Sequence, residues 1–170
     1  MFRIMWDRVK VEEEVVTGEG NISCLDFWVP VHIYADGNDI AGGSFTNMYS
    51  FYTALLNAFS VIDPENLSDK LVRLSHQGNK ISEVGFTFYL HPDLVNDALT
   101  IRYTHAHQDG YSVVKIGIKD FAGEILRSAK ELLEEIVPLD AECNEDAFYQ
   151  ALKKDFEIFR DWYNRRYQYV

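Results

Sequence analysis

Hydrophobic and polar residues alternate along three closely spaced stretches in the middle of the chain. Residues 84–90, 99–105 and 114–118 each repeat with a period of two, which is typical of β-strands with one buried face. At Asp120 the period changes to about 3.6 residues and continues to Ile136, as in an amphipathic helix. The sequence therefore predicts an antiparallel meander with a helix laid across its apolar face.

The chain before the meander predicts further strands. Alternating or β-branched residues occupy four stretches: 2–16, 22–34, 39–41 and 71–74. Pro30 lacks the N–H that a sheet hydrogen bond requires, so its strand is expected at a sheet edge or to carry a bulge there. Ala35–Asn38 contains a glycine that accepts positive φ, which favours a hairpin turn.

Three stretches are amphipathic with helical spacing. The first is expected to begin at Ser44 or Thr46, either of which could cap it, and to end before Pro64. The second follows the meander, with Asp120 as its cap. The third is expected to start at Asn144–Asp146, and its acidic start and basic end suit the helix dipole. Its apolar stripe consists of Phe148, Leu152, Phe156, Phe159 and Tyr163.

This order of elements favours the α+β class: a mostly antiparallel sheet of about six strands packed against helices, with a C-terminal helical pair. A chain of 170 residues, 47% of them hydrophobic, is large enough to bury a core of its own. We therefore expect residues 1–170 to form a single domain.

Acidic residues outnumber basic ones by 27 to 16, which gives a formal net charge of −11. This balance argues against a nucleic-acid partner, because phosphate contacts require clustered Lys and Arg. It fits either a basic protein partner or a protein that is merely kept soluble by its charge. The segment 120–157 concentrates the acid, with 11 acidic and 4 basic residues.

The number of cysteines and the hydropathy of the chain predict where the protein resides in the cell. Cys24 and Cys143 are the two cysteines and form no CxxC pair, so we expect reduced thiols and a cytoplasmic protein. Charges recur through residues 1–8, so no signal peptide is expected. No stretch approaches the roughly 20 apolar residues of a membrane helix, so no membrane partner is expected.

The candidate metal ligands are His105 and His107. Residues two apart on a strand point to the same side, so both imidazoles could reach one ion. A metal site usually needs three or four ligands, and the third could be His91, Asp109 or His32. Two partly exposed hairpin histidines are the competing interpretation. We find no motif for an organic cofactor, and Gly42-Gly43-Ser44 lacks the lysine of a phosphate-binding loop.

The candidates for contact with a protein partner are acidic and aromatic. The carboxylates are Glu131, Glu134, Glu135, Asp140, Glu142, Glu145 and Asp146. The aromatic candidates are Trp162 and Tyr163, together with Trp28, Tyr34, Tyr167 and Tyr169. Aromatic side chains beside carboxylates are typical of interfaces, but a place in the core explains them equally well. A packed C-terminal tail is the alternative for Tyr167 and Tyr169.

Two segments resemble small acidic α+β immunity proteins of bacterial polymorphic-toxin and contact-dependent inhibition systems. Val31–Ile40 leads into an amphipathic helix, and Asp109–Ile118 leads into the helix 120–136, as in those proteins. The resemblance implies a non-catalytic intracellular protein that neutralises one toxin by covering its site. It transfers no residue roles.

Three functions follow as hypotheses. The first is an acidic immunity protein that binds a basic toxin, such as a nuclease, directly. The second is a metal-dependent enzyme that uses His105 and His107. The third is a regulatory module or an inhibitor that mimics nucleic acid with its acidic face.

Overall fold

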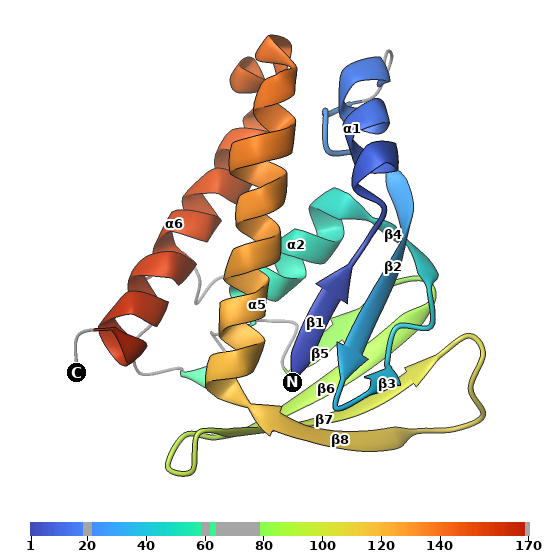
Figure 1. Ribbon diagram of the computed structural model, residues 1–170, viewed down its shortest axis with the longest axis vertical. Helices are drawn as coiled ribbons and strands as arrows, with labels where there is room; N and C mark the ends of the chain where they lie inside the picture. The colour runs from blue at the N-terminus through green and yellow to red at the C-terminus, as the bar shows by residue number, and fades with distance from the viewer. Residues whose placement is uncertain (19–21, 59–61, 64–78, 169–170) are drawn as a thin grey trace.

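The computed structural model describes residues 1–18, 22–58, 62–63 and 79–168, and it is an α+β structure. Two antiparallel sheets of four strands each lie below and beside a group of helices (Figure 1). The expected class is therefore confirmed. The expected single sheet of about six strands is wrong, because the N-terminal strands pair only among themselves.

The first sheet is built around one strand. Its members are β1 (Phe2–Met5), β2 (Trp28–Ala35), β3 (Asn38–Asp39) and β4 (Ser44–Asn47). β1, β3 and β4 all pair antiparallel with β2. The link between β3 and β4 contains Gly42 and Gly43, which both have positive φ. Pro30 lies in β2, opposite Phe45 of β4.

The second sheet is the expected meander. Its strands are β5 (Lys80–Ser82), β6 (Phe86–Asp93), β7 (Ala98–His105) and β8 (Ser112–Gly117), in that order across the sheet. Burial alternates along β6, so that Phe86, Phe88 and Leu90 face inward. The period of two read from the sequence is thus the period of burial in the structure.

Among the described residues, the helical segments are α1 (Arg8–Thr17), α2 (Met48–Asn57), α5 (Ile118–Lys130) and α6 (Ala147–Tyr167). The turns after α5 are a π-helical turn, η3 (Glu131–Ile136), and two 3₁₀ turns, η4 (Val137–Leu139) and η5 (Ala141–Glu145). α5 and α6 lie side by side and run in opposite directions, which confirms the C-terminal helical pair (Figure 1). No helix in the described parts of the chain is long and apolar enough to cross a bilayer.

The buried apolar side chains form one connected cluster. Phe51 of α2 packs edge-on against Phe86 of β6, with ring centroids 6.2 Å apart. Phe121 of α5 packs against Phe2 of β1 at 5.0 Å. α5 therefore lies mainly along β1 and α6, and not across the meander as expected. The reason is that the chain leaves β8 at the edge of its sheet and rises away from it (Figure 1).

The N-terminal prediction is wrong beyond Met5. Asp7 accepts hydrogen bonds from the backbone N–H groups of Val9 and Lys10 and thereby caps α1. Val11 and Val15, four residues apart, are the buried residues of this helix. The N-cap and the spacing of one helical turn therefore favour a helix here, although Val-Lys-Val alternates as in a strand.

Other predicted boundaries also move. The strand expected at 22–34 begins at Trp28, and the return strand ends at Asp39. Ser44 and Thr46 belong to β4, and Asn47 caps α2 in their place. Asp120 lies in the first turn of α5, whose N-cap, Gly117, makes no side-chain hydrogen bond. The stretch 71–74 lies outside the described residues.

Candidate functional site

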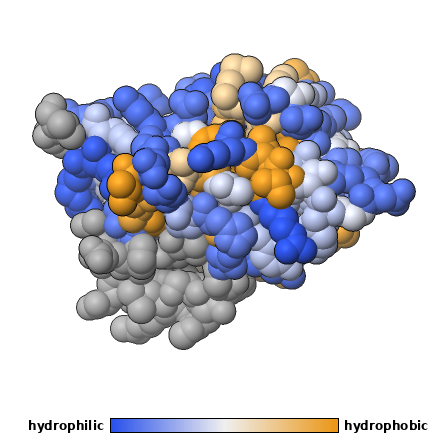
Figure 2. Space-filling view, turned by 90° about the horizontal axis from the view of Figure 1, so that it is seen from below, coloured by the Kyte–Doolittle hydropathy of each residue, from blue (hydrophilic) through white to orange (hydrophobic). Residues whose placement is uncertain are grey.

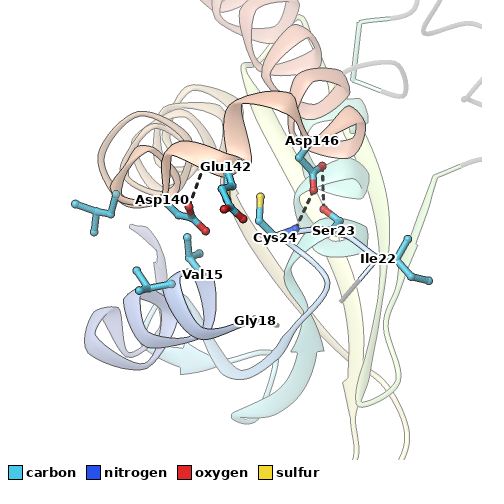
Figure 3. A pocket seen from close by; sticks show the side chains of 11 residues that line it. Val15, Gly18, Ile22, Ser23, Cys24, Asp140, Glu142 and Asp146 are labelled. Carbon is cyan, nitrogen blue, oxygen red and sulfur yellow. Dashed lines mark hydrogen bonds between the residues drawn. The ribbon is translucent and has the colours of Figure 1, made fainter. Parts of the chain in front are cut away.

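A cleft of about 640 Å³ opens between the C-terminal end of α1 and the turns that precede α6. Residues 22–24 line its third side. Its lining consists of Val15, Val16, Gly18, Ile22, Ser23, Cys24, Leu139, Asp140, Glu142, Cys143 and Asp146. Figure 3 shows Asp140 and Glu142 directing their carboxylates into the space beside Val15 and Cys24.

Asp146 holds two walls of this cleft together. It caps α6 by accepting from the N–H of Tyr149 at 2.8 Å. Its carboxylate also accepts from the Ser23 hydroxyl at 3.1 Å and from the N–H of Cys24 at 2.9 Å. Burial alone would raise the pKa of Asp146, but these hydrogen bonds outweigh it, so the pKa lies below its usual value. The group is therefore a carboxylate at neutral pH.

Asp140 and Glu142 bring further negative charge to the cleft. Asp140 accepts from the N–H of Glu142 at 3.0 Å and thus caps η5. The Glu142 side chain is exposed. Neither carboxylate pairs with a cation in the parts of the chain that the structure describes. Among the described residues, the lining also contains no Lys or Arg, so the cleft concentrates unneutralised negative charge.

Exposed apolar side chains surround these carboxylates. Ile22, Val16 and Leu139 lie at the margin of the cleft and are exposed. Lys and Arg side chains have an apolar stem and a cationic end. An acidic interior with an apolar margin therefore suits such a side chain inserted from outside.

Two thiols, Cys24 and Cys143, lie in the wall of the cleft. Burial raises the pKa of the Cys24 thiol, and its neighbours Cys143 and Asp146 raise it further. Burial also raises the pKa of Cys143. Neither cysteine forms a disulfide in the structure. A protonated thiol is a poor nucleophile, so these raised pKa values disfavour attack by either thiol at neutral pH.

The acidic candidates from the sequence fall into two groups. Asp140, Glu142 and Asp146 line the cleft, and Glu145 is exposed beside them on η5. The structure pairs the other three with arginines of the same chain. These ion pairs are Arg8–Glu131 at 3.4 Å, Arg127–Glu131 at 3.0 Å, Arg8–Glu135 at 3.2 Å and Arg160–Glu134 at 3.6 Å. Glu131, Glu134 and Glu135 thus do not form a free acidic face.

The aromatic candidates are also separated. Trp162 is 2% exposed, and its indole N–H donates to Asp63 at 3.1 Å, so it belongs to the core. Tyr163 is half-buried and packs against Tyr167, with ring centroids 5.0 Å apart. The Tyr167 hydroxyl donates to Asp97 at 2.6 Å, which supports the packed-tail alternative. Tyr169 lies outside the described residues.

Trp28 and Tyr34 have a different environment. Both lie on β2 and point away from the core, and Trp28 is exposed. Tyr34 stacks on His32, with ring centroids 6.2 Å apart. These two residues remain available for contact, on another part of the surface from the cleft residues.

The candidate histidines do not converge on one point. The Nδ1 of His105 accepts from the backbone N–H of His107, and their ring centroids are 6.3 Å apart. His32 is held by Asp39, with 2.7 Å between Nδ1 and the carboxylate. Within the described ranges, no three His, Cys, Asp or Glu side chains are arranged to hold a metal ion.

No protein-family model matches the chain, and neither a curated protein nor a solved structure is significantly similar to it.

Sequence reasoning missed the residues that α1 and the segment after it bring to the cleft. Val15, Val16, Ile22 and Ser23 are far in sequence from Asp140 and Asp146. The hydrogen bonds of Asp146 to Ser23 and Cys24 connect the segment after α1 to the cap of α6, and α1 itself packs against η4. The detectable signal was Asn144–Asp146 as a helix start, which identifies Asp146 as a cap but not what else it binds.

Proposed function

We propose that this protein is a non-catalytic binding protein that receives a basic segment of a protein partner in the acidic cleft. By covering that segment it inhibits the partner, as the resemblance to immunity proteins implies. The partner is a basic protein, such as a toxin domain that acts on nucleic acid. The contact residues are Asp140 and Glu142, with Glu145 at the margin.

The observation that carries this proposal is the charge of the cleft. Asp140, Glu142 and Asp146 line one concavity, and no Lys or Arg is among the described residues of its walls. In contrast, Glu131, Glu134 and Glu135 are already paired with arginines. Charge complementarity at such a site speeds association and disfavours partners of the wrong sign.

A labelled arginine-rich peptide tests the binding step. Its fluorescence anisotropy should rise on addition of the protein, and the affinity should fall as salt rises towards about 0.15 M. Glu142→Gln removes one charge from the cleft without removing a side-chain contact, and we expect it to weaken binding about threefold to tenfold.

Glu157→Gln is the matched control. Glu157 is exposed on α6, makes no ion pair among the described residues, and does not line the cleft. The control changes the net charge equally. Equal losses in both variants, or an affinity that does not depend on salt, would show that the cleft is not the site.

The inhibitory role needs a cellular test. Co-expression of this protein with a toxin encoded beside its gene should restore growth, and Glu142→Gln combined with Asp140→Asn should reduce that protection. If the double variant protects as well as the wild type at an equal protein level, the cleft is not responsible for inhibition.

A further inference from the structure

The outward face of the meander carries a row of alternating cationic and aromatic side chains. Lys80 lies opposite Tyr89, Tyr89 opposite Arg102, and Arg102 opposite Val113 in the strand register. These four residues therefore lie side by side across all four strands. Lys115 lies two residues along β8 from Val113 and so on the same face.

Two tyrosines hold the guanidinium of Arg102. The guanidinium carbon lies 4.2 Å from the ring centroid of Tyr111 and 5.6 Å from that of Tyr89. The Lys80 ammonium lies 5.9 Å from the Tyr89 ring. The tyrosine rings restrict the arginine, while the hydrogen-bonding edge of its guanidinium makes no hydrogen bond to a described residue.

No carboxylate of the described chain pairs with this arginine. Other arginines in the described residues do form ion pairs: Arg3, Arg8, Arg127, Arg160 and Arg166. Within the four strands of the meander, Asp93 is the one carboxylate, and it is hydrogen-bonded to Asn96 at the end of β6. A protein with 27 acidic residues thus places one carboxylate in the four described strands of the meander.

The face is also open. Lys80, Arg102, Tyr111, Val113 and Lys115 are all exposed. Figure 2 shows the molecule from below, the side on which β8 lies in Figure 1, and most of that surface is hydrophilic with small, separate apolar areas. The acidic cleft belongs to the opposite end, where α1 and the turns after α5 lie. The acidic cleft and this cationic face therefore lie at different ends of the molecule.

We propose that this face of the meander, defined by Lys80, Tyr89, Arg102, Tyr111 and Lys115, is a second docking surface that binds an acidic segment of a protein. Arg102 is the central contact. Its guanidinium donates two parallel hydrogen bonds to one carboxylate of the partner, as in a bidentate ion pair. Lys80 and Lys115 attract further acidic residues on either side. The inference does not depend on the cleft.

Three features favour an acidic protein segment over a nucleic acid. The faces of Tyr89 and Tyr111 are already in contact with Arg102 and Lys80, so bases would have to displace these cations to stack. The overall charge of −11 also repels a polyphosphate strand more strongly than a peptide with a few carboxylates. Tyr and Arg are, in addition, the residues enriched in protein interfaces.

The test uses a fluorescein-labelled peptide of alternating Glu and Ser and, in parallel, a labelled oligothymidylate. With the full chain at low salt, we expect the peptide to bind and Arg102→Gln to weaken it about tenfold. Tyr111→Leu keeps the charge but removes the ring beneath the guanidinium, and should weaken the peptide about threefold. Arg165→Gln is the matched control, because Arg165 is exposed on α6 and has no ion pair in the described chain.

Each outcome decides the proposal. A loss in Arg102→Gln with near-unchanged binding in Arg165→Gln supports it, provided both variants melt at the wild-type temperature. Equal losses of affinity in the two variants would show that net charge alone explains the effect, and would overturn the proposal. Absence of peptide binding would overturn it as well. Oligothymidylate bound more tightly than the peptide would identify single-stranded nucleic acid as the ligand instead.

Discussion

The carboxylate of Glu124 accepts a hydrogen bond from the backbone N–H of Ile4 at 2.9 Å. Glu124 also binds Arg127, whose guanidinium donates to the carbonyl of Ile4 at 3.0 Å. Two side chains of α5 thus satisfy both backbone groups of one residue in β1, as a neighbouring strand would. The pair closes an edge that could otherwise add a foreign strand.

This relationship predicts a large loss of stability in Glu124→Ala. The substitution leaves the buried Ile4 N–H without its acceptor, and it leaves Arg127 with Glu131 as its remaining carboxylate partner. We expect the free energy of unfolding in urea to fall by about 2–3 kcal/mol, below the full cost of breaking a buried pair because Arg127 is partly exposed. Glu157→Ala, on the exposed side of α6, should change it by less than ~0.5 kcal/mol. A similar small change in Glu124→Ala would contradict this role.

Asp39 predicts a specific pH dependence. It accepts from His32 and from the N–H groups of Ile33, Ala41 and Gly42. Burial alone would raise its pKa, but the hydrogen bonds from His32 and from the backbone hold that pKa below its usual value. The carboxylate form therefore stabilises the fold above the unfolded-state pKa near 4, and this stabilisation is lost as the pH falls through the lower, folded-state pKa.

Asp39→Asn is the corresponding experiment. We expect it to be less stable than the wild type by about 1–2 kcal/mol between pH 5 and 7, with a difference that shrinks as the pH falls below about 4. Denaturant titrations across this range measure the difference. A gap that stays constant down to the acid transition would mean that Asp39 acts without its charge.

Gly43 is predicted to tolerate alanine less well than Gly110. Both have positive φ, at 65° and 72°. A Cβ on Gly43 would lie 2.7 Å from Cε1 of His32, whereas one on Gly110 would meet nothing within 4 Å. Gly110→Ala should cost about 1 kcal/mol of backbone strain, and Gly43→Ala about 1–2 kcal/mol more.

A double-mutant cycle identifies the cause of that difference. In a His32→Ala background the imidazole is gone, so the additional cost of Gly43→Ala should disappear. Thermal unfolding of the four variants supplies the four stabilities. If the additional cost persists without His32, the strain lies in the backbone and not in the contact.

Cys24 and Cys143 should react slowly with iodoacetamide. Because burial raises the pKa of both thiols, little thiolate is present at neutral pH. Alkylation followed by mass spectrometry should be at least about tenfold slower than that of an unfolded control in urea. Rapid labelling of Cys24 in the folded protein would instead reveal an activated thiol in the cleft.

The local part of the fold was accessible from the sequence. The meander and the stripe of Phe121, Ile125 and Ala129 lie where the periodicity predicted them, because burial on a strand or helix repeats with the backbone itself. The sequence did not predict α1, because Val9 and Val11 alternate with polar residues as in a strand. The helix was indicated by Asp7, which caps it. Short stretches cannot resolve the two periods.

The site was accessible only in part. Carboxylates at 131–146 could be counted from the sequence, but their partners could not. Arg8 and its partner Glu131 are 123 residues apart in the sequence. Ser23 and its partner Asp146 have the same separation. The Lys80–Tyr89–Arg102 row likewise depends on strand register, which joins three residues with no common local pattern.

The sequence by itself determined the class of fold, the strands of the meander, the final helices and the excess of negative charge. Each of these depends on spacing within one element or on composition. The tertiary structure alone decided which carboxylates are neutralised, where the cleft lies and which face of the sheet stays cationic. Ion pairs, concavities and cross-strand rows form between segments that come into contact only in the folded protein. These contacts leave no periodic pattern in the sequence.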